Sequence, residues 1–283
     1  RSNMSLGNFS EAQRCLNNAL EIDPKDKAVQ DELAQFKKVE SMFADAKKEL
    51  ENNQLSGALM EVKQILRVFP DLIGAKIMYV EILARIGEPA AAIERSSEYL
   101  QQLATNTNFL YARGLALCYN GTVEMAKKTW QEALRLDPDN IKCMKALKRM
   151  NRQEEAKEKG NDAFKTGNLV KAVEFYTEGI ETDPLNRNIV SAMYANRAAA
   201  YKKLKKYEDA LKDCDEAIKL NSQYAKAYLR RGEINMAMGE FDEAKADFNQ
   251  AHQIDPNLGA RQKIKEAEIE AKKAARKDYY KIL

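Results

Sequence analysis

Five polar side chains in the second half of the chain have types and spacings that suit the binding of an anion. Lys157 and Asn161 are four residues apart, and so are Lys226 and Arg230. Residues four apart project from the same face of a helix, so each pair is expected to present its side chains together. With Asn196, the set supplies three cations and two amides. Lysine and arginine donate charge-assisted hydrogen bonds to carboxylates, and an asparagine both donates and accepts.

A peptide C-terminus with an acidic last residue matches this set, because its main-chain and side-chain carboxylates lie close together. Capture of a terminal carboxylate is a recurring mode of peptide recognition. Each charge-assisted hydrogen bond contributes about 1.5 to 3 kcal/mol before ordering costs. The set is therefore compatible with micromolar binding, about 8 kcal/mol overall. We predict a peptide-carboxylate site with no catalytic residue and no metal ligand.

The composition excludes several other kinds of function. The 283 residues carry 46 Lys+Arg against 43 Asp+Glu, a formal net charge of +3, whereas nucleic-acid binders usually have a strong basic excess. The single histidine, His252, leaves little room for hydrolase triads or histidine-rich metal sites. Widely spaced cysteines fit reduced thiols, and no apolar run is long enough to cross a bilayer. We expect a protein of the cytoplasm, with the nucleus left open, that is not an enzyme and needs no cofactor.

An internal repeat supplies the framework that positions the five polar residues. Turn segments begin at seven positions, which are Gly7, Asn53, Gly87, Gly121, Gly167, Lys205 and Gly239. Three of the intervals between neighbouring turn starts equal the tetratricopeptide repeat length of about 34 residues. Alanine stands five residues after every turn start. Proline closes five of the seven units, at Pro24, Pro70, Pro138, Pro184 and Pro256.

This pattern predicts a stack of helical hairpins. Two helices approach closely where small residues meet, and large residues beside them fill the groove. Gly114, Gly160 and Gly232, seven residues before their turns, are the matching small residues on the first helices. One hairpin cannot bury its apolar face alone, so the hairpins stack into a superhelix with a concave inner groove. The predicted fold is an all-α tetratricopeptide-repeat superhelix, with the five polar residues on the helices that line the groove.

The intervals that end at the turns of Asn53 and Gly167 are longer than one repeat by a dozen positions, which adds about 18 Å of helix. They predict long connecting helices over residues 26–51 and 141–165. The chain is thus predicted to contain the end of a first repeat group (1–25), a middle group (26–139), a last group with the polar site (140–258) and a capping helix (259–283). Because it opens at a turn without a start methionine, we expect a piece of a longer protein that lacks at least the first two repeats.

The segments that carry the polar site resemble the two-carboxylate clamp of chaperone-binding tetratricopeptide domains. They are Lys157-Glu158-Lys159-Gly160-Asn161-Asp162-Ala163, Tyr194-Ala195-Asn196-Arg197 and Lys226-Ala227-Tyr228-Leu229-Arg230-Arg231. All five clamp positions hold the residue types of that family. The resemblance implies binding of the Glu-Glu-Val-Asp tails of the 70-kDa and 90-kDa heat-shock chaperones.

A second resemblance lies at the end of the chain. Its residues Arg276-Lys277-Asp278-Tyr279-Tyr280-Lys281-Ile282-Leu283 are similar to the opening of a J domain. Together with the clamp, they make the chain resemble tetratricopeptide co-chaperones that have three repeat groups and a C-terminal J domain. That resemblance implies an adaptor that links both chaperones and stimulates ATP hydrolysis by the 70-kDa one. The J-domain motif His-Pro-Asp is absent, since His252 is followed by Gln253, so we expect tail binding without ATPase activation.

The middle repeat group has lost the clamp residues. Its equivalent positions hold Phe43, Lys47, Met78, Asn108 and Ala112. With one cation left and a more apolar lining, this groove is not expected to bind a carboxylate tail. It is either an ordinary groove without a ligand or a contact surface for a client or another part of the chain. The alternative to a tail-binding adaptor is therefore a scaffold whose main ligand is a folded client on the middle groove.

Overall fold

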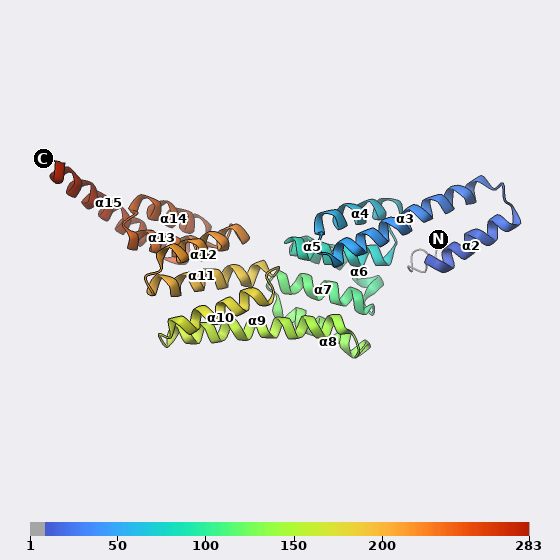
Figure 1. The fold of residues 1–283 in the computed structure, drawn as a ribbon, viewed down its shortest axis with the longest axis horizontal. Coiled ribbons are helices and arrows are strands. Elements are labelled where there is room, and N and C mark those ends of the chain that lie inside the picture. Colours follow the sequence, from blue (N-terminus) through green and yellow to red (C-terminus); the bar gives the residue numbers. More distant parts are fainter. Residues whose placement is uncertain (1–8, 283) are drawn as a thin grey trace. The chain divides into compact units, whose positions relative to one another are not determined.

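The computed structural model describes residues 9–282, with side chains up to residue 276, and this range is built from helices joined by short turns (Figure 1). The helices are α2 (Phe9–Ile22), α3 (Lys27–Glu51), α4 (Leu55–Val68), α5 (Ile73–Ile86), α6 (Pro89–Leu103), α7 (Thr107–Tyr119), α8 (Val123–Leu136), α9 (Ile141–Lys165), α10 (Leu169–Thr182), α11 (Arg187–Lys203), α12 (Tyr207–Leu220), α13 (Ala225–Met238), α14 (Phe241–Ile254), the short 3-10 helix η1 (Pro256–Leu258) and α15 (Ala260–Ile282). The predicted all-α class is confirmed. The two predicted long helices are also present, as α3 and α9.

The chain divides into two compact units, residues 1–147 and 148–283, and the boundary falls within α9. We refer to them as the first unit and the second unit. Each unit is a series of helical hairpins whose neighbouring helices pack against one another. The predicted four-part grouping (1–25, 26–139, 140–258 and 259–283) is finer than this two-part division and stays a prediction.

The predicted turns coincide with left-handed backbone. Six turn starts have positive φ, namely Asn53, Gly87, Gly121, Gly167, Lys205 and Gly239, and the predicted turn at Gly7 lies outside the described residues. Glycine adopts this conformation without steric cost, whereas Lys205, with φ 59°, must accept some strain. The left-handed residue ends the first helix and lets the chain reverse into the second.

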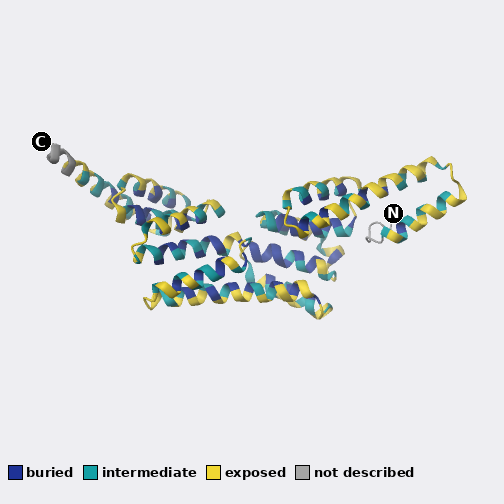
Figure 2. Ribbon diagram, in the orientation of Figure 1, coloured by how far each residue is buried: buried dark blue, intermediate teal, exposed yellow. Residues whose placement is uncertain are grey.

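Small residues at the hairpin crossings are buried, as the repeat pattern predicts. Figure 2 shows buried residues along the helices of both units. The repeat alanines have no exposed surface in six hairpins, at Ala58, Ala92, Ala126, Ala172, Ala210 and Ala244. Three glycines on first helices lie against a large ring on the second helix. A Cβ atom at Gly160 or Gly232 would come within 2.6 Å of the Tyr176 or Phe248 ring, and one at Gly114 would overlap the Trp130 indole. The rings therefore need glycine opposite them.

The ends of the second helices also follow the sequence. Each closing proline stands two residues beyond a helix, as with Pro138 after α8 and Pro184 after α10. After α14, helix α15 buries Ala260 and Ala267 against Phe248 and Ala244. The J-domain-like residues from Lys277 onward have side chains outside the described part. Nowhere in that part does a helix combine the length and the apolarity needed to cross a membrane.

The ring-on-glycine packing makes Gly114→Ala a destabilising substitution. We expect a loss of about 1–3 kcal/mol in the first unit, because the new methyl group overlaps a buried indole. Trp130 is the only tryptophan of the chain, so urea unfolding followed by tryptophan fluorescence reports on this unit. Gly57→Ala is the control, since its methyl group would meet only the end of the flexible Glu49 side chain. Alanine favours a helix over glycine by about 1 kcal/mol, so the control midpoint should hold or rise. A midpoint for Gly114→Ala as high as that of the control would contradict the packing argument.

Candidate peptide-binding groove

The five predicted site residues lie in the second unit, on the first helices of three successive hairpins. Lys157 and Asn161 are on α9, Asn196 is on α11, and Lys226 and Arg230 are on α13. Asn161, Asn196 and Arg230 line one open pocket of about 180 Å³, which we call the clamp pocket. Lys157 and Lys226 are not in its lining, but each lies one helical turn before a lining residue. The structure thus brings three of the five together and places the other two on the same helices nearby.

The amide of Asn161 is oriented by two hydrogen bonds. Its Oδ1 accepts from the Tyr176 hydroxyl at 2.8 Å and from Asn196 Nδ2 at 3.2 Å. With Oδ1 occupied twice, Nδ2 of Asn161 is the group left to donate to a ligand oxygen. Burial raises the pKa of Tyr176 to about 12, although the charge of Arg230 opposes this shift. Tyr176 is therefore a neutral phenol at physiological pH and keeps its hydrogen-bond donor.

From the sequence alone, Tyr176 was assigned no role in the site. It stands at the same repeat position as Trp130 and Phe248, and its ring packs on Gly160 in the same way as theirs pack on Gly114 and Gly232. The sequence signal for its role is the residue type. This repeat position holds a tyrosine here, whereas the other two hairpins have tryptophan and phenylalanine, which carry no hydroxyl group. The Tyr176 hydroxyl lies within hydrogen-bond distance of Asn161, the residue that follows Gly160.

The remaining lining of the clamp pocket is partly cationic. It consists of Phe164, Lys165, Tyr176 and Ala199. The ammonium group of Lys203 lies over the Phe164 ring, 4.2 Å from its centre, so a further cation stands beside the pocket. Together with Arg230, these groups favour a negatively charged ligand.

A buried glutamine fixes α9, which carries two of the site residues. Gln153 is 1% exposed, and its Nε2 donates to the carbonyl groups of Gly179 (3.0 Å) and Asp183 (3.1 Å). Its Oε1 accepts from Asn186 Nδ2 at 3.1 Å. These bonds tie α9 to the end of α10 one turn before Lys157, so the site begins on a firmly held helix.

An arginine that follows Asn196 in the chain fixes α11. Arg197 donates from Nε and Nη2 to both carboxylate oxygens of Asp213, at 2.8 and 2.7 Å, and from Nη1 to Thr177 at 2.7 Å. Helix α11 is thus tied to α12 and to α10. A bidentate arginine–carboxylate pair holds both partners in one geometry.

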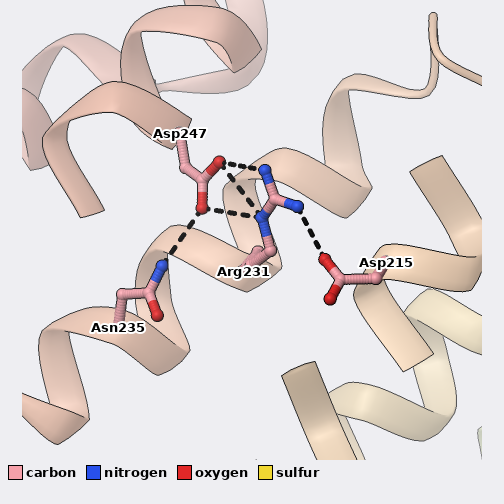
Figure 3. Close-up of polar contacts among 4 residues, drawn as sticks. All are labelled: Asp215, Arg231, Asn235 and Asp247. Carbon is pink, nitrogen blue, oxygen red and sulfur yellow. Dashed lines mark hydrogen bonds and ion pairs between the residues drawn. The ribbon is translucent and has the colours of Figure 1, made fainter. Parts of the chain in front are cut away.

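The same arrangement recurs one repeat later beside Arg230 (Figure 3). Arg231 donates to both oxygens of Asp247, at 2.7 to 3.2 Å, and to Asp215 at 2.6 Å. Asn235 Nδ2 donates to Asp247 at 3.2 Å. The hydrogen bonds that Arg231 donates, of which those to Asp247 have the largest effect, raise its pKa. They tie α13 to α14 and α12. Helices α11 and α13, which carry Asn196 and Arg230, are thus each fixed by an arginine–aspartate pair.

Glu233 is a carboxylate shared by three cations. It lies within 2.8 Å of Lys202, 3.3 Å of Arg230 and 3.0 Å of Lys263, and its side chain is 14% exposed. Burial alone would raise the pKa of this carboxyl, but the hydrogen bonds and charges of the cations outweigh it and lower the pKa to about 2. A ligand carboxylate on Arg230 therefore competes with Glu233. Sequence reasoning missed Glu233, because Lys202 on α11 and Lys263 on α15 are distant from it in the chain.

The middle-group equivalents line a different pocket in the first unit. Phe43, Lys47, Met78 and Asn108 contribute to a pocket of about 560 Å³, while Ala112 is fully buried in α7. This pocket is called the middle pocket below.

Two buried cysteine thiols are protonated, and the potential metal-binding side chains of the described residues are not clustered. Burial raises the pKa of the Cys143 thiol to about 11 and that of Cys214 to about 12, so both stay protonated at neutral pH. Within the described residues, no group of three His, Cys, Asp or Glu side chains is placed to hold a metal ion. The clamp pocket itself is lined by amide and cationic side chains, from Asn161, Asn196, Lys165 and Arg230.

The described helices form a tetratricopeptide-repeat fold. Models described as tetratricopeptide repeat match residues 1–26, 191–224 and 225–258. The solved tetratricopeptide domain of P58(IPK) covers 96% of this chain, and 77% of that domain is covered, with a TM-score of 0.58 and 19% identity. This likeness shows a shared fold.

Over its full length the chain is homologous to proteins named DnaJ homolog subfamily C member 7. It is 36% identical to the one from Homo sapiens over 283 residues, and it spans 57% of that relative's length. The resemblance predicted from the clamp and from the J-domain-like ending is thereby confirmed. A smaller solved domain, the second tetratricopeptide domain of human RPAP3 in complex with the HSP70 peptide SGPTIEEVD, covers 42% of the chain and 98% of its own length, with 37% identity and a TM-score of 0.39.

The low pKa of Glu233 makes the stability of the second unit depend on pH. Since the pKa falls from 4.5 to about 2, its ion pairs stabilise the fold fully above about pH 5, and this stability is lost as the pH falls toward 2. The contribution is about 3 kcal/mol at most. Glu233→Gln should lower the free energy of unfolding most at about pH 6 and least at about pH 2.5, measured by urea unfolding and circular dichroism. Glu243→Gln, at an exposed position of α14, should show no such convergence. A Glu233→Gln difference that stays constant with pH would refute the assignment.

Proposed function

We propose that this chain is a co-chaperone adaptor whose clamp pocket binds the acidic C-terminal tails of the 70-kDa and 90-kDa heat-shock chaperones. The observation that carries the proposal is the shared lining of one pocket by Asn161, Asn196 and Arg230. Lys157 and Lys226 stand one helical turn before Asn161 and Arg230 on the same helices. The homology to DnaJ homolog subfamily C member 7 supports the same function.

Each side chain has a role that follows from its donors. Lys157, Asn161 and Asn196 hold the main-chain carboxylate and its adjoining amide, since lysine supplies charge and Asn161 has Nδ2 free to donate. Lys226 and Arg230 bind the side chain of the terminal Asp and neighbouring peptide groups. Competition from Glu233 for Arg230 keeps the affinity moderate, which suits an adaptor that must release its partner.

The second candidate function is a scaffold that binds a folded client at the middle pocket. The observation that favours it is the larger volume and more apolar lining of that pocket, with Phe43, Ile77 and Met78. We propose the cytoplasm as the location of either function, with the nucleus left open, because the widely spaced cysteines suit a reducing compartment.

Removing one cation of the clamp should weaken tail binding. Lys226→Ala and Arg230→Ala are each expected to cost roughly 2 kcal/mol or more of binding free energy, about 30-fold in Kd, because a carboxylate loses its charged partner. Isothermal titration with a pentapeptide ending in Glu-Glu-Val-Asp measures this. Lys219→Ala is the matched control, since it removes an exposed lysine on α12 that pairs only at the surface with Glu216.

Two results of that titration would count against the clamp. One is a Kd for both alanine variants that equals the Kd of the parent chain. The other is unchanged binding after the C-terminus of the peptide is amidated, because a clamp loses most of its affinity when the terminal carboxylate is blocked. Unchanged binding of the amidated peptide would favour a groove that recognises side chains.

Tail binding by this chain is expected to leave the ATPase of the 70-kDa chaperone unstimulated. The chain contains one histidine, His252, and no His-Pro-Asp motif through which a J domain acts. Single-turnover ATP hydrolysis by the chaperone, with and without saturating amounts of the chain, should give equal rates. An increase in rate that depends on the concentration of the chain would show the prediction to be wrong.

A further inference from the structure

The middle pocket occupies the same place in its repeats as the clamp pocket does in its own. Phe43 and Lys47 stand ten and six residues before the turn at Asn53, as Lys157 and Asn161 stand before the turn at Gly167. Helices α3, α5 and α7 of the first unit thus correspond to α9, α11 and α13 of the second unit. The fold presents one type of groove twice, and the two grooves differ in their side chains.

One wall of the middle pocket is apolar and firmly supported. A Cβ atom at Gly74 would lie 2.6 Å from the Phe43 ring, so this ring rests directly on the backbone of α5. Phe9 packs against the same ring, with 5.3 Å between ring centres. Met78 and Ile77 continue the wall, and methionine adapts its shape to a bound apolar side chain. The pocket volume of about 560 Å³ lies within the range of ligand pockets.

The cationic side chains around this wall differ in how many partners they have within the fold. Arg85 donates to Glu81 at 3.2 Å, to Asn53 Oδ1 at 3.0 Å and to the Leu50 carbonyl at 3.4 Å, so it is engaged in the fold. Lys47 and Lys142 also line the pocket, and neither forms an ion pair with any described residue. Lys142 is held near the Tyr111 ring, 5.4 Å from its centre. The pocket therefore offers two available cations beside an apolar wall.

The carboxylates of the lining do not cancel these cations. Glu81 is buried and paired with Arg85. Glu51, one turn after Lys47 on α3, is exposed at the edge and leaves the lining with three cations against two carboxylates. Asn108, also exposed, adds an amide that can bond to a peptide backbone.

We propose that the middle pocket binds an internal peptide segment in which bulky apolar side chains are flanked by acidic ones. The apolar side chains pack on Phe43 and Met78, and the acidic ones pair with Lys47 and Lys142. Recognition needs no chain terminus, since this groove has Phe43, Met78 and Ala112 where the clamp has Lys157, Asn196 and Arg230. The site is therefore distinct from the clamp in both position and ligand chemistry.

A peptide with blocked ends tests the site without involving the clamp. The probe is acetyl-Gly-Glu-Leu-Phe-Glu-Gly-amide, titrated into the full chain labelled with ¹³C at its methionine methyl groups. The Met78 signal, assigned with Met78→Leu, should shift in a saturable way. A peptide with Lys in place of both Glu residues should bind at least about tenfold more weakly, because charge complementarity is lost.

Charge reversal on the protein gives the matched comparison. Lys47→Glu with Lys142→Glu should weaken binding at least about tenfold. Lys37→Glu with Lys145→Glu makes the same change in net charge at exposed positions of the same two helices outside the pocket, and should leave binding unchanged. The proposal is overturned if the Met78 signal does not shift at any probe concentration up to the millimolar range, or if both double variants weaken binding equally.

The clamp variants separate this site from the proposed function. Lys226→Ala with Arg230→Ala should bind the blocked probe like the parent chain. A loss of probe binding in this variant would place the probe in the clamp pocket and overturn the proposal. Failure of chaperone-tail binding with intact probe binding would instead refute the clamp alone.

Discussion

Close contact between an aromatic ring and a glycine is the constraint on which three of the hairpins depend. In three hairpins the ring of the second helix fills the space that a Cβ atom would need on the first. The interaxial distance is therefore set by the ring lying against bare backbone, and the alanines at the next crossing position keep the helices equally close. Stacking of hairpins follows from this spacing, because each pair presents a similar flat face to the next. Two of the three helices that carry the clamp residues, α9 and α13, are positioned by this contact.

Tyr176 connects this packing to ligand binding within one side chain. Its ring rests on Gly160, and its hydroxyl donates to Asn161, the next residue. The contact that sets the helix spacing thus also sets the orientation of an amide in the clamp pocket. Paired arginines complete the support, since Arg197 and Arg231 are each bonded to an aspartate on the following helix. The residues before them in the chain, Asn196 and Arg230, are presented to the groove by helices that have little freedom to rotate.

Much of the fold was predictable from the sequence, because the repeat imposes the same backbone demands every time. A left-handed residue is needed at each turn and a small residue at each crossing, so Gly87 and Ala92 can be located from spacing alone. The groove helices carrying the five site residues were predictable for the same reason. The ion pairs of Glu233 were not, because Lys202 and Lys263 come from helices whose side-chain directions no local pattern specifies. Whether Lys157 and Lys226 reach a ligand depends on flexible side chains, which spacing does not determine.

The two grooves show how a repeat fold separates stability from recognition. Each has an arginine paired with a glutamate on its own helix, Arg85 with Glu81 and Arg230 with Glu233. The side chain of Arg85 is 19% exposed and also bonds to the Leu50 carbonyl, so it serves the helix ends. That of Arg230 is 37% exposed, and among the residues with described side chains its one hydrogen-bonded partner is Glu233. A ligand must displace the existing partners of an arginine before it can bind there, and an exposed arginine with few partners is the easier one to reach. A ligand carboxylate is therefore bound more readily by Arg230 than by Arg85. The middle pocket must depend instead on its lysines and its apolar wall.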